Sequence, residues 1–226
     1  GVQVDPTLLW LWFRASGRAH QMRAGTYAIE RGTTPRQLLD RMLRGEQQME
    51  TVRIIEGWTF AQMREALAKA PALKPTTQGK TDAEVMALLG RPGVAPEGRF
   101  FPDTYHYSKG ASDFIVLRTA MRTMQSRLEA AWAERAPDLP LATMEQALIL
   151  ASIVEKETGI EADRTKVAGV FTNRLRIGMP LQTDPTVIYG LGTAFDGNLR
   201  KRDLLADTPF NTYTRKGLPP TPIALP

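Results

Sequence analysis

Glu155 and Glu157 follow a run of apolar residues, ALILASIV (147–154), and their carboxyl groups are candidates for moving protons. A glutamate that stays protonated near neutral pH can act as a general acid. Apolar surroundings favour that protonated form, as does the end of a helix where unpaired carbonyl groups gather. Acid catalysis by a carboxyl group is therefore the chemistry that this stretch suggests first.

The elements around these residues predict a helix that ends at the carboxyl groups. Thr143 and Gln146 form a capping-box pattern ahead of the apolar run, and Gly159 is a suitable stop. A helix of about 15 residues, roughly 22 Å long, is expected between them.

Helical spacing separates the two glutamates. Glu157 lies one turn above Ile153 and Val154, so it continues the apolar stripe and is expected to face the core or a cleft wall. Glu155 lies above Ser152, on a less apolar face. The alternative is a helix-end glutamate that faces solvent, and position alone does not choose between the two.

The amino-acid composition excludes several other kinds of functional site. The 226 residues include no cysteine, which excludes disulfides, thiolate metal sites and a cysteine nucleophile. Only two histidines occur, His20 and His106, and neither lies near a recognisable nucleophile motif or in an HExxH pair. Both are interpreted as structural or surface residues, and neither a metal nor a cofactor is expected.

The charge of the chain is modestly basic, at +5, and is spread along the sequence. This charge suits nucleic acid, a membrane surface or an anionic cell-wall polymer, and does not choose among them. No helix concentrates Lys and Arg on one face with base-reading partners, so no nucleic-acid partner is expected.

The most apolar N-terminal run, LLWLWF (8–13), is far shorter than the roughly 20 residues that a membrane span needs. The first residues also lack the charged start of a signal peptide. We expect the chain to be a fragment whose targeting segment lies outside it.

Two segments of the N-terminal third are alike. Residues 27–45 and 52–70 align at a spacing of 25 residues, with Gly32 matching Gly57. Each predicts a short strand, a glycine turn, a Thr cap and an amphipathic helix. They indicate a pair of β-α modules packed side by side, or else two unrelated strand–helix units.

The remainder of the chain is predicted to be mainly helical. Residues 71–96 are rich in proline and form a connecting region that contains a short helix. Helices are then expected over about 112–134, 144–158 and 162–177. Asp184 and Pro185 would cap a short turn of helix, followed by one more short helix and then an extended C-terminal chain. The predicted fold class is α+β.

Four ordered motifs carry a resemblance to a known family. LASIVEKETG, NRLRIGMPLQTDPTVIYG, EGRFFPDTY and FNTYTRKGLPP closely resemble the endolytic murein transglycosylase family, also called MltG or YceG-like. RAGTY and RIIEGW extend the similarity into the N-terminal part. One motif would be weak evidence, whereas four in order with compatible spacing are strong.

The resemblance implies a domain organisation and a location. It implies a LysM-like glycan-binding region (1–70), a connecting region (71–96) and a catalytic domain (97–226) whose C-terminal part is missing here. It also implies a bacterial inner-membrane protein with a periplasmic body, held by one N-terminal span that is absent from this chain.

The resemblance also implies an activity. Family members cut peptidoglycan strands between N-acetylmuramic acid and N-acetylglucosamine without water, leaving a 1,6-anhydro end on the muramic acid. Cutting of nascent strands would limit their elongation, with peptidoglycan synthases as partners. The alternative is a cell-wall-binding or scaffold protein without catalytic activity.

The catalytic glutamate of the family corresponds to the second glutamate of EKET, which is Glu157. A lytic transglycosylase can work with one carboxyl group, because the sugar supplies its own nucleophile, whereas an ordinary glycosidase needs two. Amide, hydroxyl and aromatic side chains suit sugars, and turn chemistry is the alternative explanation for the LQTDP segment. The substrate-binding candidates are Gln182, Thr183, Asn211 and Tyr213, with the carboxylates of Glu97 and Asp103 in addition.

Overall fold

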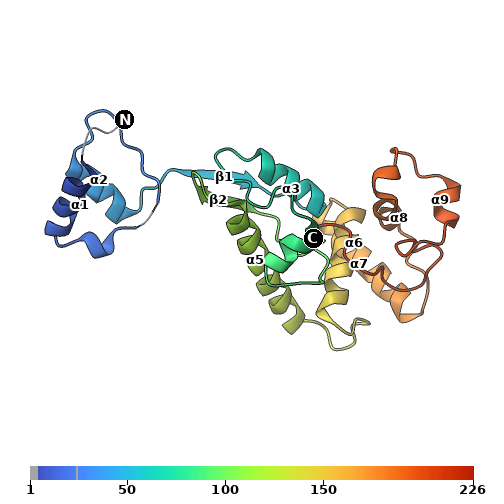
Figure 1. Cartoon of the computed structure of the whole chain (residues 1–226). Coiled ribbons are helices and arrows are strands. Elements are labelled where there is room, and N and C mark those ends of the chain that lie inside the picture. Colours follow the sequence, from blue (N-terminus) through green and yellow to red (C-terminus); the bar gives the residue numbers. More distant parts are fainter. Residues whose placement is uncertain (1–4, 24) are drawn as a thin grey trace.

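The computed structural model describes residues 5–23 and 25–226. The first four residues of the expected 1–70 region, and Ala24 of the RAGTY motif, lie outside the described residues. Helices dominate, and one small antiparallel sheet accompanies them, which confirms the α+β class. In Figure 1 a small N-terminal unit stands apart from the larger body, joined to it by the chain that leads into β1.

The N-terminal unit contains α1 (Pro6–Ala15), the 3₁₀ turn η1 (Ala19–Gln21) and α2 (Pro35–Arg44). It has a small core of its own, in which Phe13, Leu38 and Leu39 are buried. None of the helices in the described part of the chain combines the length and the apolar composition that crossing a membrane requires.

The predicted repeat is confirmed at its helix starts. Thr34 caps α2 and Thr59 caps α3 (Phe60–Lys69), and both are full capping boxes completed by Gln37 and Gln62. In each box the Thr hydroxyl accepts from the third helical N–H, while the Gln side chain accepts from the Thr N–H.

The predicted side-by-side packing of the two modules is wrong. Residues 27–31 form no strand, while β1 (Met49–Arg53) pairs with β2 (Thr104–Ser108) in register Met49↔Ser108 to Arg53↔Thr104. Helix α3 is buried in the core of the main body, whereas α2 packs in the N-terminal core. The residues that the structure describes therefore do not confirm a pair of LysM-like modules.

The core of the main body crosses both expected domain boundaries. It joins α3 to α4 (Asp82–Leu88), β2 and α5 (Asp113–Ala133), and the stacked rings of Phe60 and Phe100 lie 4.9 Å apart at its centre. Val85 of the predicted connecting region is fully buried there. Burial of such large side chains needs apolar partners from several segments, so residues 50–70 cannot form a separate core.

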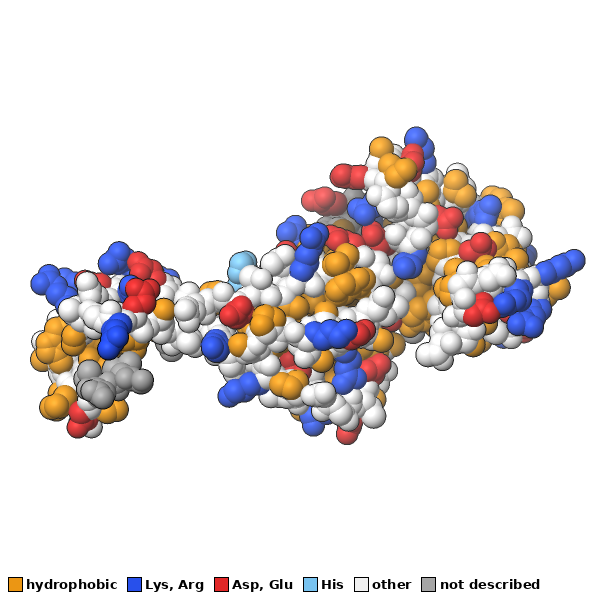
Figure 2. All heavy atoms as spheres, turned by 90° about the horizontal axis from the view of Figure 1, so that it is seen from above, with side chains coloured by type: hydrophobic (Ala, Val, Ile, Leu, Met, Phe, Trp, Pro, Cys, Tyr) orange, Lys and Arg blue, Asp and Glu red, His pale blue; other side chains and the backbone are white. Residues whose placement is uncertain are grey.

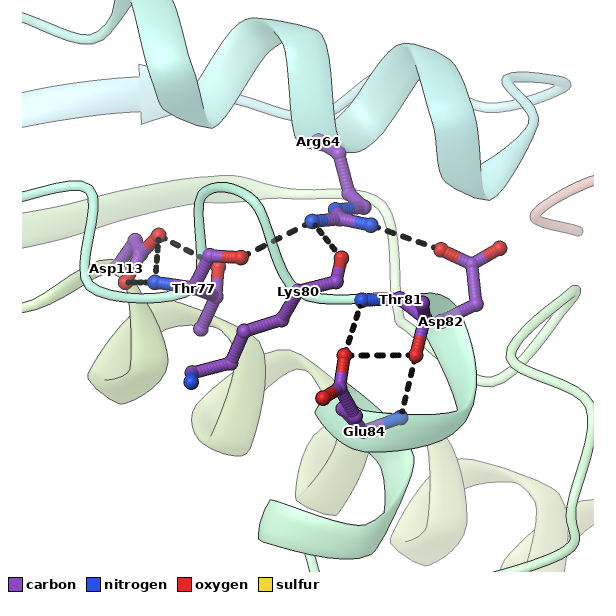
Figure 3. Close-up of polar contacts among 7 residues, drawn as sticks. All are labelled: Arg64, Thr77, Lys80, Thr81, Asp82, Glu84 and Asp113. Atoms are coloured by element: carbon purple, nitrogen blue, oxygen red, sulfur yellow. Dashed lines mark hydrogen bonds and ion pairs between the residues drawn. The ribbon is translucent and has the colours of Figure 1, made fainter.

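Polar contacts fix the loop between α3 and α4, as Figure 3 shows. The Arg64 guanidinium donates to the carbonyls of Thr77 at 3.0 Å and Lys80 at 2.8 Å, and to Asp82 Oδ1 at 2.9 Å. Buried Asp113 accepts from the Thr77 N–H and hydroxyl. The start of α4, with Asp82, is thereby held beside α3.

The second core is built by α6 (Met144–Glu157) and α7 (Glu161–Arg176), with the aromatic residue Tyr189 of α8 (Asp184–Leu191) packed against it. The 3₁₀ turn η2 (Gly192–Ala194) and α9 (Lys201–Leu205) follow. The three long helices expected from periodicity are confirmed to within a residue or two at each end.

The ends of α6 differ in detail from the expectation. Thr143 accepts from the Gln146 N–H, but the Gln146 side chain accepts from the Ala142 N–H, so the box is incomplete. The helix ends because Thr158 is extended, and Gly159 does not adopt a left-handed conformation.

The C-terminal segment joins the two cores. Ile223, Ala224 and Leu225 are buried, and the Leu225 backbone bonds with the Gly57 N–H at 2.8 Å and the Trp58 carbonyl at 2.7 Å. On the other side, the Ile223 N–H donates to the hydroxyl of Ser152 in α6 at 3.0 Å. This segment therefore lies between the α3 region and α6.

We predict that Leu225→Ala lowers the free energy of unfolding by about 2–5 kcal/mol, because it leaves a cavity between the two cores. Urea unfolding followed by circular dichroism measures the change. The matched control is Leu205→Ala, at a side chain that is 67% exposed, which should change stability by less than about 0.5 kcal/mol. Equal effects of the two variants would contradict the joining role of the segment.

Candidate active site

Glu157 is the last residue of α6, and its side chain is exposed. Its Oε2 accepts a hydrogen bond of 2.7 Å from the Thr183 hydroxyl, which comes from the start of α8. Within residues 5–23 and 25–226, no side chain or backbone N–H donates to Oε1. The contact joins the EKET and LQTDP motifs and leaves one carboxyl oxygen facing outward.

The expected orientation of the two glutamates is wrong. Glu155 is the more buried, with a side chain 13% exposed and an ion pair to Arg164 at 3.0 Å. Burial raises the pKa of Glu155, and the Arg164 charge opposes that rise. The reason is that the small Ser152, beneath Glu155, lets the C-terminal segment approach closely, so this face of α6 is a packed one.

A network of threonines holds the partner of Glu157. Thr183 is 2% exposed, and its N–H donates to the Thr212 hydroxyl at 3.1 Å. The Thr186 hydroxyl lies 2.9 Å from the Thr212 hydroxyl and donates to the Thr183 carbonyl at 2.8 Å. Buried polar groups that are hydrogen-bonded to one another are held in place. The Thr183 hydroxyl, which donates to Glu157, therefore has a fixed position. Its burial makes Thr183 a positioning residue for Glu157.

Gln182 has an exposed side chain on a strained backbone. Its φ is +52°, which is unusual for a residue other than glycine, and its N–H donates to the Thr212 carbonyl at 3.0 Å. Such conformations cost about 1–3 kcal/mol and cluster at functional sites. The exposed amide next to Thr183 is consistent with the expected substrate contact.

Tyr213 and Asp184 form a second polar pair near the same carboxyl group. The Tyr213 hydroxyl donates to Asp184 Oδ1 at 2.6 Å. Burial raises the pKa of Tyr213 to about 12, and the charges of Asp184 and Glu157 add to the rise. The phenol therefore lies near enough to Glu157 for that charge to affect its pKa. Sequence reasoning missed Asp184, because it was assigned to the cap of a helix whose cap is Thr183.

The predicted substrate contact of Asn211 is wrong. The side chain is 1% exposed, and its amide N–H groups donate to the carbonyls of Asp203, Leu204 and Ala206. Its Oδ1 accepts from the Tyr213 N–H at 2.9 Å. These bonds occupy the side chain, so Asn211 shapes the loop that presents Tyr213.

Glu97 lies at a cavity of about 770 Å³. The carboxyl is 6% exposed, and it accepts from the Phe60 N–H at 2.9 Å and the Tyr189 hydroxyl at 3.2 Å. Burial raises its pKa to about 7, against the lowering effect of these hydrogen bonds. The cavity is lined by the first turn of α3, residues 95–97, Asp82, Lys156, and α8 with η2.

The cavity adjoins Glu157 along the chain. Lys156 and Pro185 line it, and they are the immediate neighbours of Glu157 and Asp184. Figure 2 shows hydrophobic side chains gathered in a hollow between the main body and the lobe that carries α8 and α9. Glu157 and Asp184 are therefore the sequence neighbours of two residues that line the cavity.

Three other candidate residues lie elsewhere. Asp103 is exposed at the start of β2, where its carboxylate accepts from the Thr104 N–H at 2.7 Å, and it does not line the cavity. Its predicted site role is not supported by this position. His20 and His106 are exposed. Within residues 5–23 and 25–226, no group of three or more His, Asp or Glu side chains is arranged to hold a metal ion.

We predict that Glu97→Gln changes how stability depends on pH. The raised folded pKa means that protonation of Glu97 stabilises the fold fully below about pH 4.5, and this stabilisation is lost as pH rises through about 7. Relative to Glu97→Gln, the unmodified chain should therefore lose about 2–3 kcal/mol between pH 5 and pH 8. Urea unfolding of both proteins at the two pH values measures this loss.

Glu161→Gln, on the exposed first turn of α7, controls for the removal of one negative charge. A stability difference between Glu97→Gln and the unmodified chain that is the same at both pH values would contradict the prediction.

Comparisons with known proteins show which family and which proteins this chain resembles. A model of the YceG-like family matches residues 1–226. A protein of Bacillus subtilis named endolytic murein transglycosylase is 40% identical over 129 residues, which are 57% of this chain and 35% of that protein. A protein of the same name from Streptococcus pneumoniae is 27% identical over 238 residues, covering 91% of this chain and 43% of that protein.

A solved structure shares the fold. The crystal structure of a YceG-like protein from Listeria monocytogenes superposes with a TM-score of 0.62 at 25% identity, covering 98% of this chain and 78% of that one. The chain spans less than half the length of the two named relatives. Because the family model matches its whole length, the chain belongs to the YceG-like family.

Proposed function

We propose that this chain carries the catalytic site of a peptidoglycan lytic transglycosylase, with Glu157 as its acid and base. The observation that carries the proposal is the 2.7 Å bond from buried Thr183 to exposed Glu157, whose sequence neighbour Lys156 lines the cavity. The names of the relatives from Bacillus subtilis and Streptococcus pneumoniae support the same activity.

In this mechanism a single carboxyl group serves both steps. Protonated Glu157 gives its proton to the glycosidic oxygen while the bond to C1 of the sugar breaks, through an oxocarbenium-like state. The resulting carboxylate then accepts the proton of the C6 hydroxyl of the same sugar, and the C6 oxygen closes on C1. Water is not consumed, because the attacking hydroxyl is already held beside C1.

The residues around Glu157 are proposed to orient its carboxyl group and to contact the substrate. Thr183 orients the carboxyl group, and its hydrogen bond stabilises the carboxylate formed in the first step. Tyr213, fixed by Asp184, and the exposed amide of Gln182 are proposed to contact sugar hydroxyl and acetamido groups. Gln182 and Thr183 come from the segment that leads into α8, and Tyr213 comes from the segment that follows α9.

The finer features implied by the family resemblance are part of this proposal. The bond cut is that between N-acetylmuramic acid and N-acetylglucosamine in nascent strands, which limits strand elongation. The whole protein is proposed to have one N-terminal span in the bacterial inner membrane, with its body in the periplasm beside peptidoglycan synthases. The N-terminal unit is proposed to add binding to glycan strands without chemistry.

We predict that Glu157→Gln abolishes cleavage of purified peptidoglycan while the thermal unfolding curve stays cooperative, because the amide cannot donate and regain a proton. Mass spectrometry of the soluble products measures activity. It also distinguishes an anhydro-ended product from a hydrolysed one, and both from the absence of cleavage expected of a binding or scaffold protein.

Glu155→Gln is the matched control, since its carboxylate pairs with Arg164. It should keep substantial activity even if it lowers stability. Equal loss of activity in the two variants, with normal circular dichroism, would contradict a single-acid mechanism, and hydrolysed ends would contradict the lyase.

We predict that Thr183→Val lowers the turnover rate by roughly tenfold to a hundredfold, since a hydrogen bond to a charged group contributes about 1.5–3 kcal/mol. The substitution keeps the shape of the side chain and removes the hydroxyl that Glu157 uses. Steady-state kinetics on soluble glycan strands separates kcat from KM, and the loss should fall on kcat.

Thr183→Ser retains the hydroxyl and should recover most of the rate. A change confined to KM, or an equal loss in the Ser variant, would show that Thr183 does not act by orienting Glu157.

A further inference from the structure

We infer that the cavity between α3 and α8 binds one of the N-acetylated sugars that flank the cleaved bond, and that Glu97 and Tyr189 recognise its acetamido group. This inference rests on the proposed function and deepens it. It assigns a substrate subsite to a part of the molecule that lies beside the reacting carboxyl group and is separate from it.

The position of the cavity suits a neighbouring sugar. Its walls include Lys156, the neighbour of Glu157 in α6, and Pro185, two residues after Thr183. The cavity is therefore built from the same two helices that carry this pair, and we infer that a glycan cut at Glu157 extends into it. A volume of about 770 Å³ falls in the range of pockets that hold small ligands.

The polar floor of the cavity suits an amide N–H. Glu97 is fixed by the Phe60 N–H and the Tyr189 hydroxyl, which occupy one position on each carboxyl oxygen. A carboxylate can accept about four hydrogen bonds, so capacity remains for a donor from a ligand. An acetamido group supplies such a donor through its N–H. A sugar hydroxyl in the same place can also donate, but it has neither the carbonyl nor the methyl group of the acetamido group.

The walls suit the rest of the acetamido group. Phe60, Ala61, Pro96 and Ile188 line the cavity and offer apolar contact to a methyl group. Lys156 also lines it, and its ammonium has three donors of which one goes to the Gly57 carbonyl at 3.2 Å. A further donor can therefore reach the amide carbonyl.

The recognition elements are held rigidly, which lowers the entropy cost of binding. The Tyr189 ring packs edge-on against Phe210, with ring centroids 5.0 Å apart. The ion pair of Arg64 with Asp82, drawn in Figure 3, holds the start of α4 beside α3, and Asp82 also lines the cavity. The cavity is thus formed before a ligand arrives.

The test uses two neutral sugars on a chain that cannot turn over. Isothermal titration calorimetry compares the β-1,4 tetramer of N-acetylglucosamine with the β-1,4 tetramer of glucose, on Glu157→Gln as the background. We expect the acetylated tetramer to bind at least tenfold more tightly. Adding Glu97→Gln, which presents an amide N–H where a carboxylate accepted one, should weaken its binding about tenfold and leave the glucose tetramer unaffected.

Two further variants separate recognition from folding. Tyr189→Phe, on the same background, should weaken binding of the acetylated tetramer several-fold, and the exposed Glu161→Gln should not change it. Melting temperatures of all variants are measured. The loss of affinity on Glu97→Gln is expected at pH 8, where Glu97 is a carboxylate, and should shrink at pH 5, where its pKa of about 7 leaves it protonated.

Equal affinity for the two tetramers, no measurable binding of the acetylated tetramer, or full affinity after Glu97→Gln would each overturn the inference. Failure of the proposed function is a separate result. It would appear as the absence of anhydro-ended products when the chain with Glu157 intact is given peptidoglycan, whatever the sugar selectivity of the cavity.

Discussion

The burial of the C-terminal segment between two hydrophobic cores is the constraint on which the site depends. Leu225 shares two backbone hydrogen bonds with Gly57 and Trp58, and Ile223 bonds to Ser152 of α6. Gly98 has no side chain at the point where a Cβ would come within 2.5 Å of Pro222. This close packing sets the distance between α3 and α6, and both helices contribute residues to the cavity lining.

The catalytic carboxyl group combines exposure with a fixed orientation. Glu157 reaches solvent, so a long polymer can approach it from outside, while the hydroxyl that orients it belongs to a buried network of threonines. Asn211 extends the same principle, because its buried amide shapes the loop that presents Tyr213. Buried residues that cannot contact the substrate thereby determine the orientation of the exposed residues that can.

A buried carboxyl group at the cavity floor has a cost in stability that its hydrogen bonds only partly offset. Desolvation is the largest influence on Glu97, and the bonds from Phe60 and Tyr189 act against it. Those bonds join α3 to α8, which lie far apart in the sequence. Glu97 therefore links the two walls of the cavity as well as lining it.

Local pattern was sufficient for the helices and for most of their caps. Thr34 and Thr59 cap their helices as predicted, because a capping box involves only four consecutive residues. Glu157, Thr183 and Tyr213 were singled out through motif resemblance, and the structure joins the first two by a hydrogen bond. Thr183 is buried, so it positions Glu157 in place of the predicted substrate contact.

The features that the sequence did not predict depend on tertiary contacts. The pairing of β1 with β2 depends on residues far away in the chain. The burial of Glu155 in place of Glu157 and the internal role of Asn211 depend on the chain turning back, so that Arg164 pairs with Glu155 and the carbonyls of residues 203–206 accept from Asn211. Helical periodicity shows that two faces of α6 differ, but it does not show which neighbour covers each face. That depends on the C-terminal segment, which packs on the Ser152 face because a small side chain leaves room for its backbone.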